Sequence, residues 1–161
     1  MYFKKKEKKN MKAEIEKIPS CRIAYMRQIG PYGIANSQLM EKFKCWVKSN
    51  NLFNNTSIIL GIAQDNPAFV KPENCRYDAC LVLPDDYCVN VDEVSLSNIS
   101  GGRYAVLKIH HTAEAVQKAW AEIFLELKKQ RFRLDETRPI LERYTVELIN
   151  NHYCEICVPI Q

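Results

Sequence analysis

The feature that most constrains the fold of this chain is that one order of extended and helical patterns occurs twice. Each copy consists of an extended segment, an amphipathic helix and two further extended segments; the first copy ends near residue 83 and the second near residue 160. Both predicted helices carry a tryptophan on the apolar stripe, Trp46 and Trp120. Two such units predict an α+β domain in which two helices cover one antiparallel sheet. The boundary between the halves is the natural place for a ligand groove, because pockets favour such boundaries.

Alternation of apolar and polar residues predicts the strands, and apolar residues spaced three and four apart predict the helices. The first helix follows the break at Gly30–Gly33 and ends at Asn50. The second starts at the N-cap Thr112. The inward residues are expected to be Leu39, Phe43, Trp46 and Val47 in the first helix, and Val116, Trp120, Ile123, Phe124 and Leu127 in the second. The predicted strands are 13–16, 23–26, 57–63, 76–83, a segment from 94, 103–110, 139–144 (with continuation to 148) and 153–160, the last after a hairpin turn at 150–151.

Length and composition favour a single globular domain. The chain has 161 residues, of which 47% are hydrophobic and 26% charged. No run approaches the roughly 18 apolar residues of a membrane span. The basic first ten residues lack an apolar segment behind them and so do not make a secretory signal. We therefore expect residues 1–10 to be a disordered arm, a start-site extension or the end of a linker, and residues 11–161 to form a single domain. We also expect no membrane partner and a cytoplasmic location.

Charge and cysteine usage argue against several classes of site. The arm carries five lysines and one glutamate, which accounts for the net charge of +4 and leaves the rest near neutral. A basic nucleic-acid-binding surface is therefore not expected. Seven cysteines without tight spacing indicate reduced thiols rather than a disulfide framework. Cys154 and Cys157 have the gap of a metal pair, but positions three apart in a strand face opposite sides, so no metal or other cofactor is expected.

The segment Arg138–Tyr144 contains two of the candidate site residues, Glu142 and Tyr144. It follows the pattern of a short strand, in which Ile140, Glu142 and Tyr144 share one face. If that face is buried, the strand directs a carboxylate into the interior beside an aromatic ring, where it requires a partner or a raised pKa. If it is not, Glu142 lies in water on an edge strand. The run is too short to distinguish the two.

The order and spacing of several short motifs resemble the GyrI-like small-molecule-binding domain, also called the AraC-type effector-binding domain. The resemblance covers Met11 to the C-terminus. The motifs are Lys12–Pro19, Gly30-Pro31-Tyr32, Asp65-Asn66-Pro67, Cys75–Asp78, Ile99–Val106, Ala119-Trp120, Leu141–Tyr144 and Val158-Pro159-Ile160. The resemblance implies a duplicated strand-helix-strand-strand fold with a ligand groove between the halves.

The resemblance also implies what the residues do. In drug-sensing transcription regulators of this family a glutamate that falls on Glu142 meets cationic, lipophilic, aromatic ligands, and a helix aromatic falls on Trp120. Other members inhibit DNA gyrase or resemble hydrolases of small electrophiles. The ten residues before Met11 cannot form a helix-turn-helix domain, so the expectation is a stand-alone module without direct nucleic-acid binding. The last strand departs from the family, with Tyr153 and Cys154 where many members carry an arginine–threonine type of pair.

Three functions are compatible with these residues. In a binding module, Tyr32, Trp120, Phe124 and Tyr144 would line an apolar groove and Glu142 would offset the charge of a cationic aromatic ligand. The spacing of Trp120 and Phe124 fits a plain core equally well. In a hydrolase, Glu142 would be the general base and Tyr144 would polarise an oxygen. In an interaction module resembling the gyrase inhibitor, a protein partner would bind the surface, with the lysine-rich arm as the one candidate region.

Overall fold

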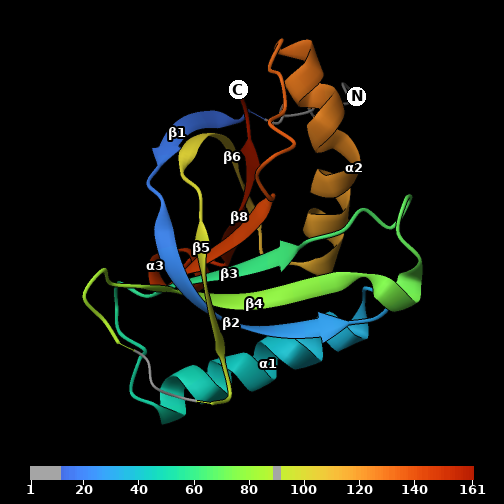
Figure 1. Cartoon of the computed structure of the whole chain (residues 1–161). Coiled ribbons are helices and arrows are strands. Elements are labelled where there is room, and N and C mark those ends of the chain that lie inside the picture. Colours follow the sequence, from blue (N-terminus) through green and yellow to red (C-terminus); the bar gives the residue numbers. More distant parts are fainter. Residues whose placement is uncertain (1–11, 89–91) are drawn as a thin grey trace, which may run out of the picture.

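The computed structural model describes residues 12–88 and 92–161, so the expected arm at 1–10 lies outside the described residues. Within these two ranges the chain forms one eight-stranded sheet and three α-helices (Figure 1). None of these helices is long and apolar enough to cross a membrane. The elements are β1 Glu14–Ile18, β2 Cys21–Ile29, α1 Ile34–Ser49, β3 Ile58–Ala63, β4 Arg76–Leu83, β5 Ser95–Ile99, β6 Gly102–His110, α2 Ala113–Lys129, β7 Leu141–Thr145, α3 Val146–Asn150 and β8 Tyr153–Pro159, with a short 3-10 turn at Pro72–Asn74.

The sheet confirms the duplicated α+β architecture. Its strand order is β1-β6-β8-β7-β3-β4-β2-β5, and the paired neighbours are all antiparallel. One unit is β2-α1-β3-β4 and the other is β6-α2-β7-β8. The strand before each unit is added to the other unit: β1 pairs with β6, and β5 pairs with β2. The two units meet at the β3–β7 pair, where Gly61 lies opposite Glu142.

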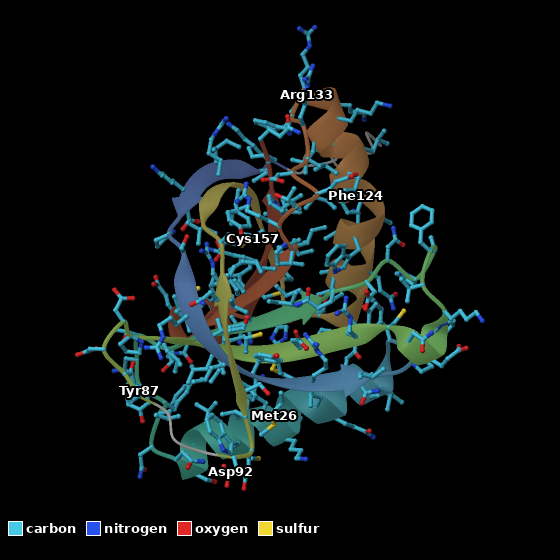
Figure 2. All side chains as sticks on the ribbon, in the orientation of Figure 1. Met26, Tyr87, Asp92, Phe124, Arg133 and Cys157 are labelled. Atoms are coloured by element: carbon cyan, nitrogen blue, oxygen red, sulfur yellow. The ribbon has the colours of Figure 1, made fainter. Side chains whose placement is uncertain are left out.

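Helices α1 and α2 pack on the same face of the sheet. Phe43, Trp46 and Val47 of α1 are buried against β2, β3 and β4, and Ile123 and Leu127 of α2 are buried against β6 and β8. One register row crosses this face from beneath α1 to beneath α2: Met26, Ala79, Gly61, Glu142, Ile156 and Leu107. Met26 marks the α1 end of this row in Figure 2. Gly61 and Glu142 therefore lie midway between the two helices.

The predicted helical stripes are confirmed with one exception. Leu39 is partly buried and packs against the α1 core, and Val116 and Trp120 pack in the same way against the α2 core. The inward placement of Phe124 is wrong, because its side chain is 41% exposed. The buried row of α2 instead includes Ala119, which lies one turn before Ile123 and is 2% exposed. Helix α2 therefore buries a narrower stripe than expected.

The opposite face of the sheet curls around a core of its own. Leu60, Ile62, Leu141 and the fully buried Tyr104 lie there with Cys157, which is labelled in Figure 2. Because both faces of the central strands are covered, β3, β7 and β8 form the interior of the domain.

The connection between β7 and β8 differs from the prediction. Strand β7 ends at Thr145, so the continuation to Leu148 and the two-residue hairpin at Asn150–Asn151 are wrong. The Thr145 side chain accepts a hydrogen bond from the Leu148 N–H at 3.2 Å and N-caps the short helix α3. A threonine N-cap satisfies helix donors that would otherwise lack partners. Apolar and polar residues alternate only weakly in Val146–Ile149, so the strand pattern there is poor. The Thr145 cap favours the helix instead.

Candidate functional site

Glu142 and Tyr144 form a hydrogen-bonded pair on the helix-covered face. The Tyr144 hydroxyl donates to Oε2 of Glu142 at 2.7 Å. Both side chains are half-buried, and Tyr144 packs against the core beneath α1 and the core beneath α2. Strand β7 lies between β8 and β3, so the alternative of an edge strand with Glu142 in water is wrong. The strand directs a carboxylate into the region between the two helices.

Burial raises the pKa of Glu142 above its ordinary value of 4.5. The hydrogen bond from Tyr144 and the neighbouring Trp120 side chain both act in the opposite direction, but burial is the larger effect. Burial and the Glu142 carboxylate in turn raise the pKa of the Tyr144 phenol, so that phenol stays protonated as the donor. In the described residues Glu142 makes no ion pair. A partly desolvated carboxylate of this kind favours either a proton or a cationic partner.

Gly61 and Tyr77 complete the floor of this region, and sequence reasoning missed both. A Cβ atom at residue 61 would overlap the Tyr77 hydroxyl oxygen and lie 3.4 Å from Oε2 of Glu142. Tyr77 of β4 is only 6% exposed, and burial followed by the Glu142 charge raises its pKa. Glycine at residue 61 thus allows the phenol to approach the carboxylate. A glycine inside an apolar strand was the available signal, because such glycines mark close approaches.

Helix α2 contributes two aromatic rings of unequal burial. Trp120 is half-buried beside Glu142, and its ring centroid lies 6.3 Å from that of Phe124 at an interplanar angle of 45°. Phe124 lies on the solvent side of Trp120 and is exposed. The structure therefore brings Glu142, Tyr144 and Trp120 together and leaves Phe124 beside Trp120 on the solvent side. We call Glu142, Tyr144, Trp120, Tyr77 and Gly61 the Glu142 site.

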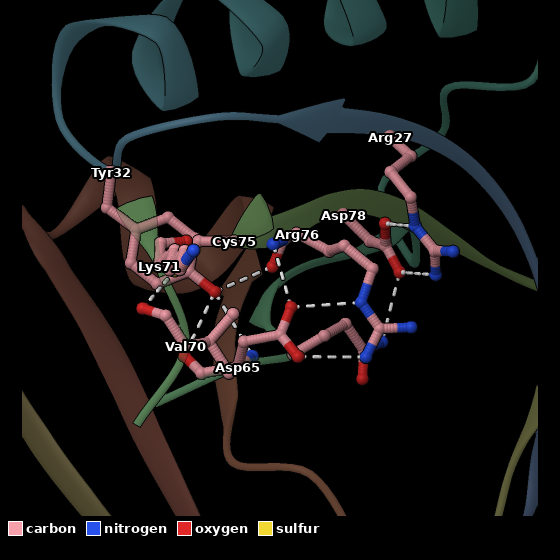
Figure 3. Close-up of polar contacts among 9 residues, drawn as sticks. Arg27, Tyr32, Asp65, Val70, Lys71, Cys75, Arg76 and Asp78 are labelled. Atoms are coloured by element: carbon pink, nitrogen blue, oxygen red, sulfur yellow. Dashed lines mark hydrogen bonds and ion pairs between the residues drawn. The ribbon is translucent and has the colours of Figure 1, made fainter. Parts of the chain in front are cut away.

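Tyr32 is the predicted residue that lies apart from this site. Its hydroxyl is 2.7 Å from the Arg76 carbonyl oxygen and accepts a hydrogen bond from the Asp65 N–H at 3.1 Å (Figure 3). It thereby ties the start of α1 to the β3–β4 connection. Across residues 12–88 and 92–161, no hydrogen bond or ring contact joins Tyr32 to the other four.

Two further residues bring positive or titratable groups to Tyr144. The Lys44 ammonium of α1 lies 5.8 Å from the centroid of the Tyr144 ring, and the His111 ring lies 5.4 Å from the same ring. Burial and the nearby Lys44 charge lower the pKa of His111, which favours neutral imidazole. Neither residue belongs to a periodic apolar pattern, so the sequence offered no signal for them. The Tyr144 ring already contacts one cation of the protein itself.

Two other acidic side chains, Asp65 and Asp78, hold loops and strands together. Asp65 accepts two hydrogen bonds from the Arg76 guanidinium, both at 2.9 Å. Asp78 is 2% exposed and accepts from Nε of Arg27 at 2.7 Å and from Gln64 at 3.0 Å (Figure 3). Because both carboxylates are paired with arginines, they have structural roles. Glu142 differs from them in lacking such a partner in the described part of the chain.

The cysteines do not form a metal site in the described residues. Cys154 belongs to the core beneath α2 and Cys157 to the core inside the curl, on opposite faces of β8. No group of three or more His, Cys, Asp or Glu side chains within the described ranges could hold a metal ion.

Residues 11–161 match the family described as the GyrI-like small molecule binding domain. YosT, a protein of the SPbeta prophage of Bacillus subtilis strain 168 that is named as a transcriptional regulator, is 46% identical over 94% of this chain and 100% of its own length. A protein of Citrobacter rodentium named DNA gyrase inhibitor is 26% identical over 91% of this chain and 93% of its own length.

Solved structures share the fold at low sequence identity. The C-terminal domain of EcmrR superposes with a TM-score of 0.72 at 16% identity, covering 94% of this chain and 98% of that one. SAV2435, whose structure was solved with tetraphenylphosphonium bound, superposes with a TM-score of 0.61 at 14% identity over 94% of each chain.

Proposed function

Because the chain belongs to the GyrI-like small-molecule-binding family, we propose that it binds a cationic or lipophilic aromatic compound at the Glu142 site. The observation that carries the proposal is the state of Glu142: a half-buried carboxylate with a tyrosine hydroxyl as its hydrogen-bond donor and no ion pair in the described residues. A ligand cation would supply the missing counter-charge.

The surrounding rings support an aromatic ligand. Tyr144 contacts Glu142 from the same strand, and Trp120 approaches it from α2. Phe124 extends the aromatic surface outward from Trp120. Each ring that contacts a desolvated cation contributes about 0.5–2 kcal/mol. Tetraphenylphosphonium, bound in the SAV2435 structure, has both the charge and the rings and is therefore a suitable probe.

The test compares two ions of nearly the same shape and opposite charge, tetraphenylphosphonium and tetraphenylborate, by thermal shift and calorimetric titration. At about a hundred times its Kd a ligand stabilises the folded state by roughly 2.7 kcal/mol. The wild type should prefer the cation, and Glu142→Gln should lose most of that preference. Glu147→Gln, at an exposed position of α3, is the matched control and should bind as the wild type does. Equal binding of both ions, or unchanged cation binding by Glu142→Gln, would refute the proposal.

Hydrolysis of a small electrophile is the second candidate, favoured by the raised pKa of Glu142 and its contact with Tyr144. A carboxylate of raised pKa is a better general base near neutral pH. In this case Glu142→Gln would abolish turnover of an epoxide or a similar substrate while leaving its binding intact. A binding module would show no turnover at all.

A protein partner is the third candidate, and it is supported by the relative named DNA gyrase inhibitor. The direct measurement is DNA supercoiling by gyrase with increasing amounts of the purified protein. Inhibition that survives Glu142→Gln would indicate a surface role independent of the Glu142 site.

A further inference from the structure

A cavity of about 200 Å³ has Tyr144 as one of its lining residues. The C-terminal half of α1, the start of β3 and helix α3 line it, and it is open to solvent on one side. Its apolar wall is made of Val47, Ile59, Phe53 and Ile149. Phe53 is 46% exposed and Ile149 is 36% exposed, so an occupant would cover apolar surface that now faces water. Glu142 is not among the residues that line this cavity.

The charges around this cavity have one sign. Lys44 and Lys48 both line it, and within residues 12–88 and 92–161 none of its lining residues is Asp or Glu. The two lysines lie four residues apart on α1 and so on the same helix face. Lys48 rests 5.8 Å from the centroid of the Phe53 ring, as Lys44 does from that of Tyr144. Neither lysine forms an ion pair in the described part of the chain.

The size of the cavity limits the occupant to a small molecule. Sites for drug-sized ligands measure about 300–1,000 Å³, so this cavity has room for about one ring and a polar group. An apolar wall beside two ammonium groups matches a molecule with a hydrophobic body and one negative end. Apolar burial would hold the body, and charge-assisted hydrogen bonds would hold the anionic end.

We propose that this cavity binds a small aromatic carboxylate, with its ring against Phe53, Val47 and Ile149 and its carboxylate between Lys44 and Lys48. The charge preference is opposite to that of the Glu142 site. The protein would then have two neighbouring sites of opposite sign that share Tyr144. This inference goes beyond the proposed function and does not depend on it.

Benzoate, benzamide and benzamidine are the probes, because they share one shape and carry a negative, a neutral and a positive end. Titration calorimetry or ligand-observed NMR with the full chain should show saturable binding of benzoate. Benzamide and benzamidine should bind at least about tenfold more weakly, since a charge-assisted hydrogen bond exceeds about 1.4 kcal/mol. Absence of saturable benzoate binding, or equal affinity for benzamide, would overturn the proposal.

Variants locate the site. Lys44→Met and Lys48→Met should each weaken benzoate binding severalfold, and the double variant should abolish it. Lys42→Met is the matched control: Lys42 is exposed on the same helix, does not line the cavity, and its replacement should leave benzoate affinity unchanged. If Lys42→Met weakens benzoate binding equally, the effect comes from the net charge of the protein and the assignment of the site is wrong.

A second pair of variants separates this cavity from the Glu142 site. Ile149→Trp should fill the cavity and block benzoate, while leaving tetraphenylphosphonium binding intact. Glu142→Gln should do the reverse and retain benzoate binding. Loss of benzoate binding in Glu142→Gln, with an unchanged Tm, would place the anion at the other site and refute the inference.

Discussion

Replacing Gly61 by alanine tests whether the close approach of Tyr77 to Glu142 depends on the missing side chain. The added Cβ would overlap the Tyr77 hydroxyl oxygen, lie 3.2 Å from its Cζ and lie 3.4 Å from Oε2 of Glu142. Overpacking of a buried position costs about 1–3 kcal/mol. Alanine in a strand otherwise gains about 0.5–1 kcal/mol over glycine. We expect a net loss of roughly 1–2 kcal/mol.

Scanning calorimetry of the wild type, Gly61→Ala, Tyr77→Phe and the double variant measures this loss and identifies its cause. For a chain of this length, 1 kcal/mol corresponds to a Tm shift of about 2–4 °C, so Gly61→Ala should lower Tm by roughly 2–8 °C. In a Tyr77→Phe background the overlapping oxygen is absent. The remaining 3.2 Å contact requires a shift of only a few tenths of an ångström. Gly61→Ala should therefore be nearly neutral there.

The double-mutant cycle gives the decisive quantity. Residues in direct contact typically show interaction energies of about 0.5–3 kcal/mol in such a cycle, and we expect at least about 1 kcal/mol between residues 61 and 77. If Gly61→Ala costs the same in both backgrounds, the phenol does not depend on the glycine and the reasoning fails. A parallel titration with tetraphenylphosphonium should show weaker binding by Gly61→Ala, because the displaced phenol crowds Glu142.

Three further predictions concern charged residues. Burial raises the pKa of Glu142, so the contribution of its protonated form to stability is complete below about pH 4.5 and is lost as the pH rises through the folded-state pKa. Glu142→Gln should therefore be more stable to denaturant than the wild type at pH 8 but not at pH 4. Equal stability of the two proteins at pH 8 would contradict this. Lys44→Met removes the cation beside Tyr144 and should tighten tetraphenylphosphonium binding about two- to fivefold by calorimetry, whereas weaker binding would show that Lys44 supports the site. Asp78→Ala leaves Arg27 without its carboxylate partner. Broken buried pairs typically cost about 3–5 kcal/mol, and we expect a loss toward the lower end because Arg27 is 33% exposed and can reach water. A loss below about 1 kcal/mol in a denaturant melt would be inconsistent with this.

Local physics accounts for what could be predicted from the sequence. The alternation in residues 103–110 and the stripe of Phe43, Trp46 and Val47 depend on neighbours within one strand or two helical turns. The Thr112 cap likewise depends on a donor three residues away, the N–H of Ala115. The duplicated architecture follows from the order in which these local patterns occur along the chain. The common face of Glu142 and Tyr144 also follows, because it requires only a period of two.

The remaining features depend on pairing between distant segments. Strands β1 and β5 join the opposite halves, and no local pattern specifies a partner some 80 residues away. The spacing of Phe124 fits the apolar stripe, but the way α2 packs on β6 and β8 leaves its side chain exposed. The same orientation determines which ring lies beside Glu142.

Sequence patterns predict most of the helices and strands, their repeated order and the carboxylate and tyrosine on one face of a strand. That this strand is central, that Gly61 lies opposite Glu142, and that Tyr77, Lys44 and His111 gather near the pair follow only from the folded domain. Periodicity specifies only the direction of a side chain relative to its own backbone. Its neighbours, its burial and therefore its charge state are set by strand register and helix packing across the whole domain.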